Sequence, residues 1–126
     1  MQIVLSGHGI EVTESIRLYV HEKIGKLEEF FHNIQKVEVI LDLRANADPE
    51  KRNVVEIRAW LAGNKVVQAL EAAVDMYAAF DLVLEEAKHQ VQKHKEKHLK
   101  EDRKLAGEFK RKMKEAGEEF IAPDSL

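Results

Sequence analysis

Alternating apolar and polar side chains in the middle of the chain constrain its fold more than any other feature. Residues 36–43 mostly follow this period of two, residues 55–61 follow it throughout, and a third strand is expected over 65–70. The apolar positions of the first two segments are Val37, Val39, Leu41, Leu43, Val55, Ile57, Ala59 and Leu61. Gly63-Asn64, between the second and third segments, suits a hairpin turn. The pattern predicts a sheet with one face buried and the other open to solvent.

Two amphipathic helices are predicted on either side of these strands. The first covers about 14–31, with Thr13 as its N-cap and Glu14 in its first turn. The second begins near Ala72 or Ala73, and its apolar line is Tyr77, Phe80, Leu84, Ala87 and Val91. A short strand over 2–6, closed by a turn at 7–9, completes the order β-α-β-β-β-α. This order predicts an α+β fold: a four-stranded sheet with two helices packed on one face.

The 126 residues have room for one domain, expected over 1–100, followed by a charged extension over 101–126 that is partly helical or flexible. The chain has no cysteine, which excludes disulfides and thiolate chemistry. We see no signal peptide and no apolar run of the roughly 20 residues that a bilayer requires. A cytoplasmic protein is therefore expected. We also expect it to be monomeric when free.

Charge is distributed very unevenly along the chain. Residues 88–114 contain eleven Lys/Arg against four Asp/Glu, a balance of +7, although the whole chain has a net charge of −3. Residues 1–87 have a balance of −6, with nine basic and fifteen acidic side chains. A basic segment of this kind points to a polyanion such as nucleic acid, although many charge runs are only solvated helix faces.

Helical periodicity gathers part of this charge on one face. At about 100° per residue, a stripe about 80° wide contains His89, Lys93, Lys97, Lys100 and Lys104. Such a stripe could contact successive RNA phosphates, but it could equally be a solvated face. The first predicted helix carries a second basic set among acidic neighbours, for which solvation is the simpler interpretation: Arg17, Lys23 and Lys26.

Other candidate sites are weak. His94 and His98 are spaced i,i+4, but flanking lysines and the misplaced Glu96 disfavour a metal site. Arg58 and Trp60 are expected on the open sheet face, where a lone aromatic is better explained by packing or a protein contact than by base stacking. No nucleophile motif, P-loop or dinucleotide fingerprint is present, so neither an enzyme nor a cofactor is indicated.

Four strings in order resemble one protein family. They occupy residues 9–20 (GIEVTESIRLYV), 26–28 (KLE), 75–81 (DMYAAFD) and 93–97 (KHKEK). In these strings the chain resembles the ribosome hibernation-promoting factors and ribosome-associated inhibitors. The resemblance implies a domain akin to double-stranded-RNA-binding domains that occupies the messenger and transfer RNA channel of the small subunit. Translation would thereby be inhibited in resting, stressed or stationary-phase cells. The implied partners are the 30S subunit, the 70S ribosome and 16S rRNA, with no membrane and no small-molecule substrate.

The resemblance also implies an RNA-binding set on both helices. Its members are Arg17, Lys23, Lys26, Lys88, His89, Lys93, Lys95, Lys97 and Lys100. Two departures weaken the start of the second-helix surface: Glu85-Glu86 replace a common lysine, and His89 replaces a usual arginine. The 25 or so residues after position 101 are too few for the dimerising domain of the family's long members, so a short form is expected. Two alternative functions stay open: a generic double-stranded-RNA-binding module and a protein–protein adaptor.

Overall fold

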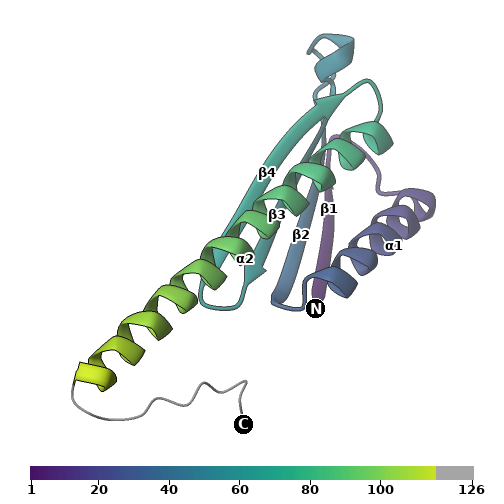
Figure 1. Cartoon of the computed structure of the whole chain (residues 1–126). Coiled ribbons are helices and arrows are strands. Elements are labelled where there is room, and N and C mark those ends of the chain that lie inside the picture. Colours follow the sequence, from purple (N-terminus) through teal and green to yellow (C-terminus); the bar gives the residue numbers. More distant parts are fainter. Residues whose placement is uncertain (116–126) are drawn as a thin grey trace. The chain divides into compact units, whose positions relative to one another are not determined.

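A computed structural model of the chain has the predicted order of elements (Figure 1). It describes the backbone of residues 1–115 and their side chains except those of 98, 99, 101, 102 and 113–115. The elements are β1 (Gln2–His8), α1 (Glu14–Phe30), β2 (Ile34–Leu43), the 3₁₀ turn η1 (Pro49–Lys51), β3 (Asn53–Leu61), β4 (Lys65–Ala73) and α2 (Met76–Glu115).

The four strands form one sheet in the order β1-β2-β3-β4. β1 runs parallel to β2, with α1 as the connection between them, and the other pairs are antiparallel. Gly63 and Asn64 both have positive φ, 85° and 60°, as the tight turn between β3 and β4 requires. The hairpin predicted from Gly63-Asn64 is therefore confirmed.

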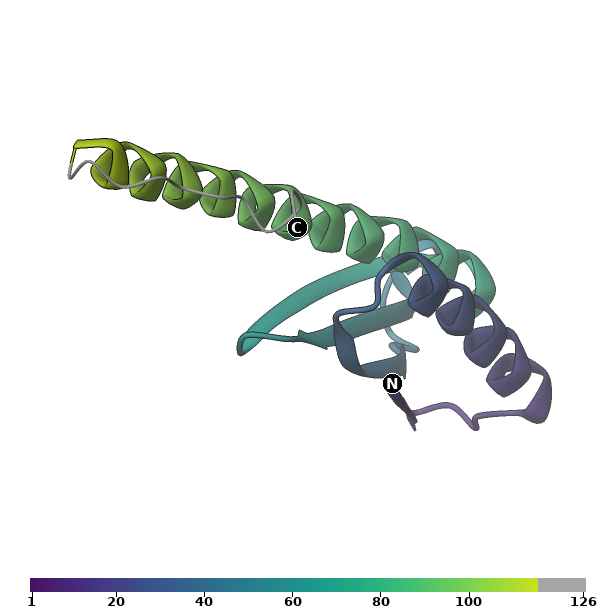
Figure 2. The same ribbon diagram turned by 60° about the horizontal axis from the view of Figure 1, so that its bottom comes forward.

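Both helices pack on the same face of this sheet (Figure 2). The core contains every second residue of the strands and one stripe of each helix. Within α2 the stripe is broader than predicted, because Met76, Ala79 and Val83 are buried together with Phe80, Leu84, Ala87 and Val91. The predicted α+β architecture is confirmed.

Element boundaries differ from prediction at two places. β4 extends to Ala73, paired with Asn53 of β3, so the prediction that the helix starts at Ala72 or Ala73 is wrong. The ladder hydrogen bonds to β3 override the helix propensity of these alanines. The helix instead begins after Asp75, whose side-chain Oδ1 accepts a hydrogen bond of 2.8 Å from the Ala78 amide.

β1 is also longer than predicted. It continues through Gly7 and His8, which pair with Leu41 and Asp42 of β2. The predicted turn over 7–9 is therefore wrong at its first two residues. The chain leaves the strand at Gly9, which has a φ of 68° that glycine adopts without strain.

The chain divides into two compact units, Met1–Val91 and a second that begins at Gln92. The first holds the whole sheet, α1 and the first turns of α2. The second contains the rest of α2 to Glu115, and the flexible end predicted within 101–126 falls in part on residues 116–126, outside the described range. Across the described residues we find no helix that combines the length and the apolar character needed to span a membrane.

Candidate nucleic-acid interface

A polar and aromatic cluster fixes how α1 faces the first turns of α2. The Tyr19 hydroxyl donates a 2.6 Å hydrogen bond to Oδ1 of Asp81. The Tyr19 ring meets the Tyr77 ring edge-on, with centroids 5.1 Å apart, and the Phe80 ring at 5.9 Å. The Ser15 and Tyr77 hydroxyls are 3.0 Å apart in a second hydrogen bond. These contacts set the orientation in which the two helices present their surface side chains.

Sequence reasoning missed this cluster. It placed Tyr77 on the apolar line of the helix, but 38% of Tyr77 is exposed, and Met76 takes the buried place beside it. The sequence pattern also predicted no partner for Asp81. The available signal was a pair of i,i+4 spacings, Ser15 to Tyr19 and Tyr77 to Asp81, each of which puts two polar side chains on one flank of a helix.

The hydrogen bond to Asp81 is the largest cause that raises the pKa of Tyr19 from its ordinary value of 10.0 to about 12. Partial burial of the ring and the negative charge of Asp81 raise this pKa further. Tyr19 is therefore a neutral donor at physiological pH, and the link between the helices does not change its protonation there.

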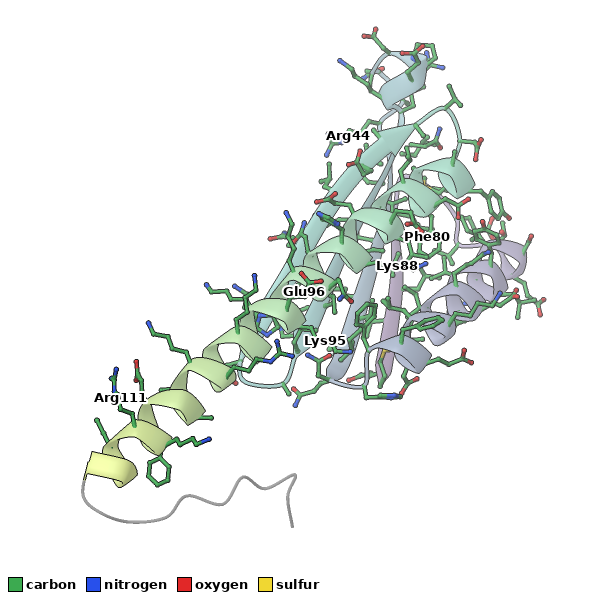
Figure 3. The ribbon with its side chains drawn as sticks, in the orientation of Figure 1. Arg44, Phe80, Lys88, Lys95, Glu96 and Arg111 are labelled. Atoms are coloured by element: carbon green, nitrogen blue, oxygen red, sulfur yellow. The ribbon has the colours of Figure 1, made fainter. Side chains whose placement is uncertain are left out.

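Three of the predicted RNA-binding lysines lie on the facing flanks of these helices. At about 100° per residue, Lys23 and Lys26 fall within about 40° of Tyr19 on α1. The Lys23 ammonium is 5.5 Å from the Tyr19 ring centroid. On α2, Lys88 falls within about 20° of Tyr77 and Asp81, and Figure 3 shows it projecting from the side of the helix near α1. The helix packing thus brings Lys23, Lys26 and Lys88 to one side of the unit.

Arg17 and His89 belong to other faces of the first unit. Arg17 lies about 160° around α1 from Tyr19, and His89 lies about 100° around α2 from Lys88. Both are exposed. The structure therefore separates these two members of the predicted set from the three lysines on the facing flanks.

Carboxylates lie beside two of the lysines. Lys26 is 3.6 Å from Glu22, and Lys88 is 3.3 Å from Glu85. The side chains are 57% and 66% exposed in the first pair and 39% and 75% exposed in the second, and such surface pairs contribute only about 0–1 kcal/mol. A polyanion could therefore replace either carboxylate as the partner of its lysine. Glu86 contacts the side-chain amide of Gln90 instead, at 3.2 Å.

The predicted lysines of the second unit point in two directions. Lys93, Lys97 and Lys100 lie within about 60° of one another on one face of α2, whereas Lys95 lies on the opposite face. All four are exposed. Lys95 is labelled in Figure 3. One flat or cylindrical RNA surface can reach the first three lysines together, but not Lys95 at the same time.

The open face of the sheet has a different chemistry. The Lys36 ammonium lies over the Trp60 ring, 4.9 Å from its centroid. Arg58 is paired with Glu56 and with Glu38, the latter at 3.7 Å. The Trp60 ring is therefore covered by a cation and half-buried, which agrees with the packing interpretation and disfavours a base-stacking platform.

The described side chains contain no group of three or more His, Cys, Asp or Glu residues arranged to hold a metal ion. Of the two histidines spaced i,i+4 on α2, His94 is half-buried. The side chain of the other, His98, lies outside the described set.

A family model and individual relatives both match most of this chain. Residues 3–99 match the family described as Sigma 54 modulation protein / S30EA ribosomal protein. The ribosome hibernation promoting factor of Azotobacter vinelandii is 38% identical over 99 residues, which are 79% of this chain and 87% of that protein. The ribosome hibernation promotion factor of Deinococcus radiodurans is 37% identical over 102 residues, which are 80% of this chain but only 53% of that protein.

Solved structures agree with the fold. The N-terminal domain of Thermus thermophilus Protein Y has a TM-score of 0.64 and 29% identity, and the match covers 75% of this chain and 99% of that one. A ribosomal subunit interface protein from Coxiella burnetii has a TM-score of 0.63 at 21% identity, over 75% of this chain and 98% of that one. With a family match over residues 3–99 and relatives of this similarity, the chain belongs to the Sigma 54 modulation protein / S30EA ribosomal protein family.

Proposed function

We propose that this protein is a ribosome hibernation factor. It binds the small ribosomal subunit through 16S rRNA, occupies the messenger and transfer RNA channel, and inhibits translation without catalysis in resting or stressed cells. The main support for the proposal is the family match over residues 3–99, together with the similarity to a relative named ribosome hibernation promoting factor. Its site of action is the cytoplasm, where ribosomes are found.

The basic side chains supply the binding chemistry. Lys23, Lys26 and Lys88 offer three ammonium groups from two helices that the Tyr19–Asp81 hydrogen bond holds in a fixed orientation. Ammonium groups bind phosphates as point charges and do not read sequence. Binding of this kind depends on the shape of the folded RNA and on charge, and it weakens steeply as salt rises.

Sedimentation of the purified protein with 30S subunits and 70S ribosomes at low salt tests the proposal. We expect the wild-type chain to sediment with both and to inhibit translation of a reporter messenger in a cell-free system. The Lys93→Glu/Lys97→Glu variant should be released from the ribosome while its melting temperature stays unchanged, because both side chains are exposed.

A matched control is Lys51→Glu/Lys65→Glu, which makes the same charge change at exposed positions on η1 and β4. This control should still sediment with ribosomes. A wild-type chain absent from the ribosomal fractions would contradict the proposal. Equal affinity for any RNA duplex, without preference for ribosomes, would instead favour a generic double-stranded-RNA-binding module.

A further inference from the structure

The helix α2 continues well beyond the part of the chain that its relatives share. The family match ends at residue 99, whereas α2 is helical to Glu115. The two solved relatives are matched over 98–99% of their own length but cover only 75% of this chain. The family match therefore implies no role for residues 100–115.

These residues extend a basic face rather than beginning a new one. At about 100° per residue, five cations of the second unit lie within about 60° of one another. We call them the distal basic row: Lys93, Lys97, Lys100, Lys104 and Arg111. All five are exposed, and the helical rise of 1.5 Å per residue makes the row about 27 Å long. Figure 3 shows Arg111 projecting outward from the helix.

Among the described side chains of this segment, the large apolar ones lie away from the row. Leu105 and Phe109, which are 63% and 54% exposed, lie about 100–160° away from its centre. Glu108 stands at one edge and is half-buried. Membrane binding would use the apolar face of the helix, with its large side chains inserted between lipids. A line of cations one or two turns apart instead complements the regularly spaced phosphates of RNA.

We propose that Lys104 and Arg111 bind RNA phosphates, so that the helical segment beyond residue 99 is a second phosphate-binding element of this protein. This inference rests on the proposed function, whose test already expects Lys93 and Lys97 to contribute to ribosome binding. It adds two contacts outside the family match and predicts which face of the extension meets the RNA.

The test compares two double variants of the full chain that remove the same charge from different faces. Lys104→Gln/Arg111→Gln removes the two contacts in the row. Lys110→Gln/Lys112→Gln is the matched control, because both of these exposed lysines lie about 100° from the centre of the row. Affinity for purified 30S subunits, and separately for protein-free 16S rRNA, is measured between 50 and 200 mM salt. Circular dichroism verifies that both variants keep their helix.

Loss of two phosphate contacts should weaken binding on the order of tenfold at 0.1 M salt. The negative slope of log K against log salt should become shallower, with its magnitude reduced by about 1.4–1.8. The control should retain the wild-type slope. Equal effects of the two variants, or no effect of either, would overturn the inference while leaving wild-type ribosome binding, and with it the proposed function, intact. A wild-type chain that binds 16S rRNA but not 30S subunits rejects the proposed function, and the two variants are then compared on the rRNA. Binding to neither rejects both.

Discussion

Tyr19 of α1 donates a hydrogen bond of 2.6 Å to Asp81 of α2, across 62 positions of sequence. The same ring packs edge-on against Tyr77, one turn before Asp81. Because the two helices share a face of the sheet, this contact determines which flanks they turn toward each other. It thereby determines that Lys23, Lys26 and Lys88 lie on one side of the unit.

We expect Tyr19→Phe to lower the free energy of unfolding by about 1–2 kcal/mol, since a hydrogen bond to a carboxylate is lost at a partly exposed site. Asp81→Ala should cost a similar amount. The double variant should cost clearly less than the sum of the two, as expected for residues in contact. Urea denaturation of the four proteins measures this coupling. Strict additivity would show that the two side chains do not interact in solution.

Stability should also depend on this hydrogen bond at alkaline pH. The pKa of Tyr19 is about 12 in the folded chain and ordinarily 10.0, so between these values the folded state retains a proton that the unfolded state has lost. The stabilisation is therefore complete below pH 10 and is lost as pH rises through 12. The stability difference between wild type and Tyr19→Phe should shrink over this window. Ultraviolet absorbance of the phenolate follows Tyr19 alone in a Tyr77→Phe background, because the chain has two tyrosines.

The sequence predicts the elements of this fold well and their mutual orientation poorly. Strand alternation and the Gly63-Asn64 turn depend on local backbone geometry, which a single sequence records directly. The predicted end of β4 is wrong because pairing with β3 extends the strand to Ala73. Strand pairing is a tertiary effect that local propensity does not contain.

In the candidate site, too, local placement can be predicted from the sequence and the orientation of the helices cannot. Periodicity places each lysine on its own helix, but it does not say which flank of α1 faces α2. The contacts of Tyr19 provide that information, and they separate Arg17 from Lys23 and Lys26. The sequence pattern predicts Tyr77 in the core because its aromatic ring fits an apolar line, whereas its hydroxyl is paired with Ser15 at the surface.

Phe80 should be the most costly core residue of α2 to truncate. It is fully buried and also contacts the Tyr19 ring. We expect Phe80→Ala to lower the free energy of unfolding by about 3–5 kcal/mol, through lost burial and the cavity that remains. Leu82→Ala, at a position 51% exposed two residues away, should change it by no more than about 0.5 kcal/mol. Thermal denaturation compares them, and similar losses for both would contradict the observed packing of α2 on the sheet.

Neutralising the facing lysines should weaken ribosome binding without unfolding the chain. Lys26→Gln/Lys88→Gln removes two cations whose carboxylate partners, Glu22 and Glu85, are exposed. We expect a drop in affinity for 30S subunits on the order of tenfold at 0.1 M salt, with an unchanged melting temperature.

The control for that experiment is Lys51→Gln/Lys65→Gln, which removes the same charge from exposed positions on η1 and β4. It should bind like wild type. If both double variants lost affinity equally, net charge would account for the effect, and the facing flanks would have no special role.

Gly107 offers a way to strengthen the distal part of α2 without adding charge. It lies inside the helix, and a Cβ atom built there meets nothing within 4 Å. Alanine should therefore fit without strain and favour the helix locally by about 1 kcal/mol, because glycine is the more flexible residue in the unfolded chain. We expect Gly107→Ala to slow amide hydrogen exchange around residues 105–111 and to tighten RNA binding modestly, since Lys104 and Arg111 would be held in register before they bind. Slower exchange with unchanged affinity would mean that these two cations do not act from a helical conformation.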